Sequence, residues 1–567
     1  NRCKAAWEII NHENSGVGHH EVTLDPELIN NHFINSVNDI SKNIPTTNTT
    51  VIDMIGDGHI PANSFRWQEV TPEDLVRVVH KFSNSKSMDF FSLSNKIVKR
   101  TIDLIKEPLA FIFSRCLEVG YFSDSLKISK VIPIYKKGDK CVPVPQNYRP
   151  ISIVPIFSKI FEAIIHEQLS SHFERFNLMS EAQFGFRAGR STTNAVMKII
   201  NHTLKAFDNR ETVALSLLDL SKAFDCVPFI SIIQKLNFYG ISENACKIIL
   251  SYLENRLQYV SVGGSNSSVH SVKIGVPQGS VLGPFFFSVI INDLPHNLSV
   301  NSVIYADDTS LFASNRNLLD LHTTIKNAEH EAQNWLSCNR LHCNSEKTQN
   351  ILLSLSGNHF QSVKLLGIWI DSKLSWVHHI DNLCKRISRV SFLLWKLRDI
   401  ISLKYLRTCY FGLFQSHISY GLILWGHSSA THRILLIQKK VLRTICRAAP
   451  QDHCKPLFIQ TKILTIINLY IYHILIHAKT NLHSFSTRQD IHEHHTRNRS
   501  KIDIPRHRLT KIGSSHQVNT IRFFNKLHNT AISTSLKTFK HKLINWLQNN
   551  PFYSIHEFLS CDVELVF

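Results

Sequence analysis

The adjacent acids Asp307 and Asp308 are the residues of this chain best placed to do chemistry. They lie between two short apolar runs, 303–305 and 311–312, a pattern typical of a tight β-hairpin with two acids at its turn. Only near a turn can neighbouring side chains both approach one point. Two carboxylates there repel each other unless a cation shares the site, and Mg²⁺ with a phosphate group is the natural partner. Taken alone, the pair is better explained as a solvated turn.

Two other segments could complete such a site. Asp219 follows the apolar run 213–218, and an acid at the end of a buried strand is well placed to face a cleft. Its alternative role is the N-cap of a helix that begins at Ser221. The loop 275–284 contains Gly275, Gln278 and Gly279, which can bring backbone close to a ligand before a helix starts. An ordinary loop is the alternative.

The bulk composition limits the function classes. The chain has 567 residues, of which 43% are hydrophobic and 19% charged, as in a folded globular protein. The net charge of +19 indicates a polyanionic partner, with nucleic acid as the first candidate. Twelve Cys without a C-x-x-C pair favour reduced thiols over a disulfide framework. The apolar stretch 463–478 is too short to span a bilayer and predicts a buried helix, so we expect no membrane partner.

The elements that must position these acids follow from periodicity and turn residues. Thr71 and Pro72 predict a helix start as N-cap and N1 residues. Strand patterns lie at 131–135, 213–220, 259–262 and 270–274. Helical patterns lie at 157–173, 230–253, 281–291, 384–398, 434–447 and 536–547. The segment 488–511 is polar and basic and predicts a linker.

In this order, the blocks resemble the polymerase motifs of non-LTR retrotransposon reverse transcriptases of the LINE-like or jockey-like kind. The matching blocks are Val131-Ile-Pro-Ile-Tyr-Lys136-Lys137-Gly138-Asp139, Asn147-Tyr148-Arg149-Pro150, Gln183-Phe184-Gly185-Phe186-Arg187, Leu218-Asp219-Leu-Ser-Lys-Ala-Phe224-Asp225, Gly275-Val-Pro-Gln278-Gly279, Tyr305-Ala-Asp-Asp308, Asn344-Ser-Glu-Lys347-Thr348 and Leu365-Leu366-Gly367.

The resemblance implies an α+β fold of the right-hand polymerase type. Such a fold has fingers, a palm with an antiparallel sheet, and a helical thumb, here with helical N- and C-terminal extensions. We expect an N-terminal connector at 1–115, fingers and palm at 116–374, a thumb at 375–480 and a basic C-terminal region at 481–567.

The resemblance also implies roles for the acids. Asp219, Asp307 and Asp308 would converge on two Mg²⁺ ions, for which Mn²⁺ is an alternative. One ion would lower the pKa of the primer 3′-hydroxyl and the other would stabilise the triphosphate. Lys347 would donate a proton to pyrophosphate, and a merely solvated lysine is the equally weighted alternative.

The nucleotide and primer sites are implied in the same way. Arg149 and either Lys136 or Lys137 would bind the triphosphate, Gln278 and Gly279 would touch the incoming nucleotide and template, and Leu366 and Gly367 would form the primer-grip turn. Phe224 would exclude a ribose 2′-hydroxyl. Asp225 complicates this assignment, because RNA-copying RNA polymerases carry a second acid at a compatible spacing. DNA synthesis is preferred because a bulky aromatic precedes that acid.

The expected function is RNA-directed DNA synthesis that extends a DNA primer at a nicked target, with an RNA template and dNTPs as partners. The alternative is a decayed or repurposed copy that binds RNA without catalysis. Reverse transcription is expected in the nucleus, after cytoplasmic assembly on RNA. The family's N-terminal endonuclease has no matching blocks before residue 130, so we expect it in the full-length protein but not in this sequence. The His-rich segment 490–495 is interpreted as a solvated linker rather than a zinc site.

Overall fold

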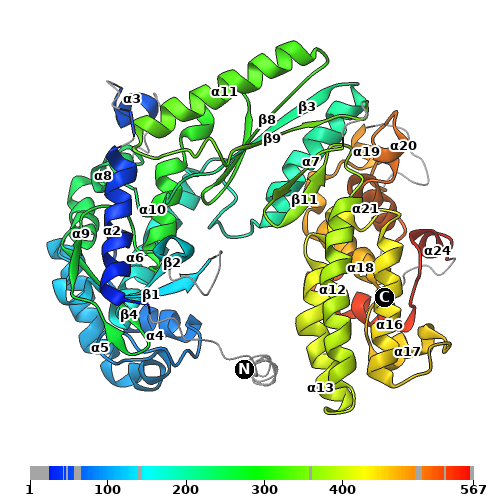
Figure 1. Cartoon of the computed structure of the whole chain (residues 1–567), viewed down its shortest axis with the longest axis horizontal. Coiled ribbons are helices and arrows are strands. Elements are labelled where there is room, and N and C mark those ends of the chain that lie inside the picture. The colour runs from blue at the N-terminus through cyan, green and yellow to red at the C-terminus, as the bar shows by residue number, and fades with distance from the viewer. Residues whose placement is uncertain are drawn as a thin grey trace.

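Figure 1 shows the computed structural model of the chain. The structure describes residues 24–42, 44–45, 49–55, 65–136, 144–356, 360–491, 501–528 and 532–561. Helices and sheets are mixed in the N-terminal part, the C-terminal part is almost wholly helical, and strands β3, β8 and β9 run between the two (Figure 1). The expected α+β class is therefore confirmed.

Four helices open the described chain. They are α2 (Pro26–Lys42), α3 (Val51–Ile55), α4 (Pro72–Lys81) and α5 (Asn95–Val119). The predicted start of α4 is confirmed: the Thr71 hydroxyl accepts a hydrogen bond from the Asp74 amide at 3.2 Å, and Pro72 occupies the first turn. The Asp74 carboxylate accepts the Thr71 amide in return at 3.2 Å, which completes a capping box.

The first sheet is built from segments far apart in the sequence. Its strands are β1 (Ile128–Tyr135), β2 (Tyr148–Ile153), β4 (Arg256–Val262), β5 (Ser265–Asn266) and β6 (His270–Val272). β1 pairs antiparallel with β2 and parallel with β4, and β6 adds to β4. In this register Ile134 lies opposite Arg149. The cationic ends of β1 and β2 therefore lie beside each other.

The second sheet has the antiparallel order β7-β8-β3-β9. Its strands are β7 (Asn301–Tyr305), β8 (Asp308–Asn315), β3 (Thr212–Leu218) and β9 (Gln349–Leu353). Side chains of β3 alternate between two cores. Val213 and Leu215 pack with the helix α7 (Thr192–Asp208), whereas Ala214 and Leu218 pack with α10 (Leu282–Ile291) and α11 (Leu318–Cys338). Burial on both faces explains why β3 is mostly apolar, with Ser216 as its buried polar residue.

Three further helices pack in the N-terminal part, beside α5 and α10. They are α6 (Ile156–Arg175), α8 (Phe229–Phe238) and α9 (Glu243–Leu253). A buried ion pair holds α8 to the segment after α10: the Lys235 ammonium donates to the Asp293 carboxylate, and these side chains are 0% and 2% exposed. The Trp335 indole donates to the other Asp293 oxygen at 2.9 Å. Asp293 is therefore satisfied from two elements.

The C-terminal part begins with the hairpin β10 (Ser362–Leu365) and β11 (Ile368–Asp371). The helices that follow are α12 (Val377–Leu397), α13 (Leu403–Cys409), the π-helix η4 (Tyr410–Gln415), α14 (Ser416–Ser419), α15 (Leu422–Trp425), α16 (Thr431–Cys446), α17 (Cys454–Thr461), α18 (Ile466–Thr480), α19 (Arg488–Ile491), α20 (Thr510–Gly513), α21 (His516–Phe524), α23 (Leu536–Asn549) and α24 (Ile555–Leu559). Buried Gln438 ties three of these together, because its amide nitrogen donates to the Tyr410 hydroxyl at 2.7 Å and its amide oxygen accepts the Ile466 amide at 2.9 Å.

The helix α18 is buried along most of its length, as the stretch 463–478 predicts. Within the described ranges, no single helix is long and apolar enough to cross a membrane. The pair α17 and α18 reaches that length and composition only when its two helices, bent by 51° at the break between them, are counted together.

Candidate active site

The expected hairpin carries the two adjacent acids. β7 ends at Tyr305 and β8 begins at Asp308, and these two residues pair across the turn. Ala306 adopts a left-handed conformation with φ +57°, which a two-residue turn of this kind requires. Gly185 lies directly against the turn, since a Cβ atom on it would come within 2.3 Å of the Ala306 nitrogen. The Gln183–Arg187 block thus backs the hairpin.

Strand register brings Asp219 to the same place. β3 pairs with β8 so that Leu218 lies opposite Thr309, and Asp219 follows directly, level with Asp308 on the neighbouring strand. The alternative N-cap role of Asp219 is wrong, because residues 221–226 form turns and the next helix begins at Phe229. Instead, the Asp219 carbonyl accepts the Asn344 amide at 2.8 Å, which fixes this segment to the block that contains Lys347.

The pKa values of Asp307 and Asp308 are affected by the neighbouring carboxylates. The pKa of the Asp308 carboxyl is raised to about 6, first by partial burial and then by the negative charges of Asp307 and Asp219. Partial burial and the Asp219 charge also raise the pKa of Asp307, against the positive charges of Arg149 and Lys136. Burial and neighbouring negative charge both disfavour the ionised carboxylates, and a positive counter-charge would favour them.

Lys347 supplies part of that counter-charge. Its ammonium lies 3.3 Å from Asp219 Oδ2, and the two side chains are 52% and 44% exposed. Such an exposed pair contributes little to stability. The contact matters because it shows that Lys347 lies beside Asp219. The sequence-predicted Lys347 is therefore brought to the acid cluster.

The chemistry of the donor set suits a divalent cation. All three side chains offer hard oxygen ligands, and the pKa values of Asp307 and Asp308 are raised first by burial and further by neighbouring carboxylates, whose repulsion a cation would relieve. Over the described ranges, however, no three His, Cys, Asp or Glu side chains already stand close enough together to hold a metal ion. The chemistry of Asp219, Asp307 and Asp308 fits the ion, whereas their convergence on it stays a prediction.

The predicted triphosphate ligands lie beside this cluster. Arg149 and Lys136 are on the neighbouring strands β2 and β1, or at their ends, and both charges reach Asp307. The Lys136 amide also donates to the Asn147 carbonyl at 2.7 Å. Lys137 lies outside the described residues, so the choice between the two lysines stays open. The histidines of the segment 490–495 also fall outside them.

The Phe224 ring packs against two other aromatic rings, face to face with Phe287 and edge to face with Phe186. Its ring stacks on Phe287 with centroids 4.6 Å apart and meets Phe186 at an angle of 87°. It is half-buried, so one part of the ring is fixed and the other is available. This arrangement suits a rigid steric gate.

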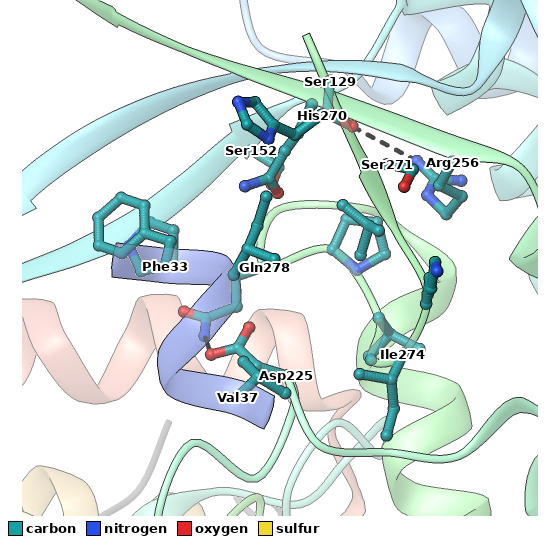
Figure 2. A pocket seen from close by; sticks show the side chains of 18 of the residues that line it. Phe33, Val37, Ser129, Ser152, Asp225, Arg256, His270, Ser271, Ile274 and Gln278 are labelled. Atoms are coloured by element: carbon teal, nitrogen blue, oxygen red, sulfur yellow. Dashed lines mark hydrogen bonds between the residues drawn. The ribbon is translucent and has the colours of Figure 1, made fainter. Parts of the chain in front are cut away.

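The loop that contains Gln278 and Gly279 is fastened on two sides (Figure 2). The Gln278 amide donates to Asp225 Oδ2 at 2.8 Å, while its backbone carbonyl accepts the Ser152 amide at 2.7 Å. Gly279 has φ +124°, and a Cβ atom there would lie 2.4 Å from the Ser152 carbonyl oxygen. Gly275 is equally close to Asp225, with its Cβ position 2.3 Å from the carbonyl oxygen. No other residue fits at either glycine without a backbone shift.

A cavity of about 330 Å³ lies behind this loop, between the first sheet and α2. Asp225 and Gln278 face each other on its wall (Figure 2). Burial raises the pKa of the Asp225 carboxyl to about 6, against the opposing effect of the Gln278 hydrogen bond. The second acid of this block is thus engaged with the loop.

The predicted primer-grip residues form the turn between β10 and β11. Leu366 and Gly367 both have positive φ, +46° and +83°. The Tyr420 hydroxyl lies 2.5 Å from the Leu366 carbonyl oxygen and 3.1 Å from the Thr192 hydroxyl, and its ring would be 3.3 Å from a Cβ atom on Gly367. Because a phenol has one proton, the Tyr420 hydroxyl donates to the Leu366 carbonyl and accepts from the Thr192 hydroxyl.

Sequence reasoning missed Tyr420 and Glu162. Glu162 is 0% exposed, and one of its oxygens accepts the Val281 and Leu282 amides at 2.7 and 3.3 Å, at the start of the helix that follows the glycine loop. A buried acid inside an otherwise apolar helical pattern was the available signal for Glu162. Tyr420 has no comparable local signal, because its partners are distant in the sequence.

Comparisons with known proteins agree with this geometry. Residues 134–370 match the reverse transcriptase (RNA-dependent DNA polymerase) family. The RNA-directed DNA polymerase from mobile element jockey of Drosophila melanogaster is 30% identical over 67% of this chain and 44% of its own length. The probable RNA-directed DNA polymerase from transposon X-element of the same species is 28% identical over 66% of this chain and 44% of its own.

A Pol polyprotein from the type-1 retrotransposable element R1 of Bradysia coprophila is 27% identical over 58% of this chain and 34% of its own length. The chain thus spans less than half of these relatives. The matched block contains the acids, the glycine loop and the primer-grip turn. Residues 134–370 thus match the reverse transcriptase (RNA-dependent DNA polymerase) family, and the chain is similar to RNA-directed DNA polymerases of mobile elements.

Proposed function

We propose that this chain is an RNA-directed DNA polymerase of a non-LTR retrotransposon, which extends a DNA primer at a nicked target on an RNA template. The observation that carries the proposal is the strand register that brings Asp219 level with Asp308, beside Asp307, at one end of the second sheet, with raised pKa values at Asp307 and Asp308. In this proposal the second sheet with α7, α10 and α11 is the palm, the first sheet with α6 forms the fingers, α12 to α18 form the thumb, and α2 to α5 belong to the N-terminal connector.

Asp219, Asp307 and Asp308 would hold two Mg²⁺ ions, with Mn²⁺ as an alternative. When bound, the ions supply an activated primer 3′-hydroxyl and charge stabilisation of the triphosphate. The acids of this chain would hold those charges at the end of β3 and at the β7–β8 turn, two rigid places. Lys347, which lies 3.3 Å from Asp219, would give a proton to the departing pyrophosphate.

The other site residues would bind and select the nucleotide. Arg149 offers planar, bidentate contact to the triphosphate, and Lys136 offers a point charge. Stacking on Phe287 would fix the Phe224 ring, and the part of the ring that Phe287 does not cover would exclude a 2′-hydroxyl by size. Asp225 is bonded to Gln278, so it would act by holding the loop under the base pair.

Primer extension tests the proposal. The protein is incubated with an RNA template, an annealed DNA primer, dNTPs and Mg²⁺, and products are resolved by length. Asp307→Ala should remove product by at least about a thousandfold, since electrostatic stabilisation at the reacting phosphate is lost, while RNA affinity stays within about twofold. Asp320→Ala, an exposed acid on α11, is the matched control and should extend normally.

The alternative, a copy that binds RNA without catalysis, gives a different result. The unmutated protein would then bind template and primer but incorporate no nucleotide with either Mg²⁺ or Mn²⁺. That outcome would refute the proposed polymerase activity.

A further inference from the structure

The distal end of α12 exposes two large aromatic rings. Phe392 is 60% exposed and Trp395 is 46% exposed. Their ring centroids are 5.9 Å apart with an interplanar angle of 26°, so the two faces are nearly parallel. Exposed rings of this size, held side by side on a rigid helix, commonly mark a binding surface.

Cations lie over both rings. The Lys396 ammonium is 5.7 Å from each ring centroid, and the Arg398 guanidinium is 5.8 Å from that of Trp395. These contacts hold the cations beside the aromatic faces. A ligand that combines flat rings with negative charge complements this surface.

The cations continue along the same face of the helix. Lys385, Arg389, Phe392 and Lys396 follow one another at spacings of four, three and four residues, which places them in one stripe. All four residues are exposed. In the part of the chain that the structure describes, none of the three cations forms an ion pair with a carboxylate.

The neighbouring acids do not neutralise the stripe. Asp381 pairs with Arg433, and Asp399 pairs with Arg398 at 3.1 Å. The positive charges of Lys385, Arg389 and Lys396 are therefore available to bind a negatively charged partner. A polyanion whose charges repeat along a strand is the complementary ligand.

We propose that Phe392 and Trp395 form a stacking platform for unpaired bases of single-stranded RNA, whose phosphates bind Lys385, Arg389 and Lys396. Bases inside a duplex are already stacked on each other, whereas unpaired bases offer free faces to aromatic side chains. The choice of RNA rests on the proposed function, in which RNA is the template.

The place of the platform separates it from the chemical site. α12 begins shortly after β11 and the primer-grip turn, and Trp395 lies about 27 Å further along the helix axis at 1.5 Å per residue. Figure 1 shows α12 as a long helix whose far end meets α13. RNA bound there is a different stretch from the templating base.

Equilibrium binding without dNTPs or Mg²⁺ tests the platform. Fluorescence anisotropy is measured with a labelled, unstructured RNA 12-mer and with a blunt RNA–DNA duplex. Phe392→Ala/Trp395→Ala should weaken binding of the single strand by about tenfold or more per ring, while duplex affinity stays within about twofold. Phe111→Ala, which removes a 73% exposed ring on α5, is the matched control and should change neither affinity.

A second variant keeps the test independent of the rings. Lys396→Gln should lower the slope of log affinity against log salt for the single strand by about 0.7, the loss of one phosphate contact. Unchanged single-strand affinity in the ring variant overturns the proposal. Equal loss of single-strand and duplex affinity also overturns it, because the face would then be an ordinary duplex contact.

A second copy of the chain is the other occupant to exclude. If the double variant abolishes a dimer in sedimentation and leaves RNA affinity unchanged, the platform is a protein interface and the RNA proposal fails. Because binding is measured without nucleotides, a protein that passes this test but extends no primer would refute the polymerase proposal and leave the platform intact.

Discussion

Replacing Tyr420 by phenylalanine should separate primer binding from nucleotide binding. The change keeps the ring that packs on Gly367 and removes the hydroxyl that joins the Leu366 carbonyl and the Thr192 hydroxyl. Both residues of the turn have positive φ, as in a type I′ hairpin turn, and the Tyr420 hydroxyl fastens this turn to Thr192 at the start of α7. Tyr420 is therefore expected to act as a positioning residue for the primer-grip turn.

The size of the effect follows from the two hydrogen bonds. Each contributes about 0.5–1.5 kcal/mol net, so the upper limit is about 2–3 kcal/mol. Tyr420 is 40% exposed, and water can replace part of what is lost, which moves the expectation to about 1 kcal/mol. That energy corresponds to a roughly fivefold rise in the Kd for the primer–template.

The assay compares Kd for the primer–template with KM for dNTP at saturating primer–template, together with product length in the presence of a trap. Tyr420→Phe should raise Kd and shorten products, while KM for dNTP stays unchanged, because Gln278 and Gly279 are anchored elsewhere, to Ser152. Tyr121→Phe removes another surface hydroxyl, bonded to Asp124, and is the control. An unchanged Kd, or an equal change in dNTP KM, would refute the positioning role.

Three further results are expected. Phe224→Ala should raise ribonucleotide incorporation by at least about tenfold relative to dNTPs, and unchanged sugar selectivity in competition assays would remove Phe224 from its role. The raised pKa of Asp225, about 6 against an unfolded value near 3.8, means that the folded state binds the extra proton between these values, so stability falls as pH rises from about 4 to 6. Asp225→Asn should remove up to about 3 kcal/mol of that fall, and urea unfolding curves that keep the same pH slope would contradict it. Asp293→Asn should lower the free energy of unfolding by about 3–5 kcal/mol, because the buried Lys235 charge loses its partner, whereas Lys235→Met in the same chain should restore much of it if the charge is the cause.

Features set by neighbouring residues were predictable from the sequence. The hairpin that carries Asp307 and Asp308 depends on two apolar runs and a short turn, and the structure confirms it. The start of α4 depends on Thr71 and Pro72 and is equally local. The segment 230–253 was predicted as mostly helical, and it is two helices separated by Gly240, which has φ +85°. Gly240 was the signal for that break in the sequence, because a glycine commonly ends a helix by adopting a left-handed conformation.

Features set by distant contacts were not predictable. Nothing near Asp219 tells that its carbonyl will bond Asn344 rather than begin a helix. The sequence near Leu366 likewise does not indicate the hydrogen bond from Tyr420 to its carbonyl, and the sequence near Gln278 does not indicate the hydrogen bond from the Ser152 amide. Sequence patterns predicted β3 and the β7–β8 hairpin but not β9, and the order β7-β8-β3-β9 is decided by packing between segments far apart in the chain.

That strand order has a consequence for how the protein is made. β3 is central, yet its two neighbours β8 and β9 leave the ribosome later. About 90 residues separate the end of β3 from the start of β8, which at 5–20 residues per second is roughly 5–20 s of synthesis. During that interval a mostly apolar strand remains without its partners, so nascent chains should need chaperones there. Any product that terminates before β8 would contain Asp219 but no active site.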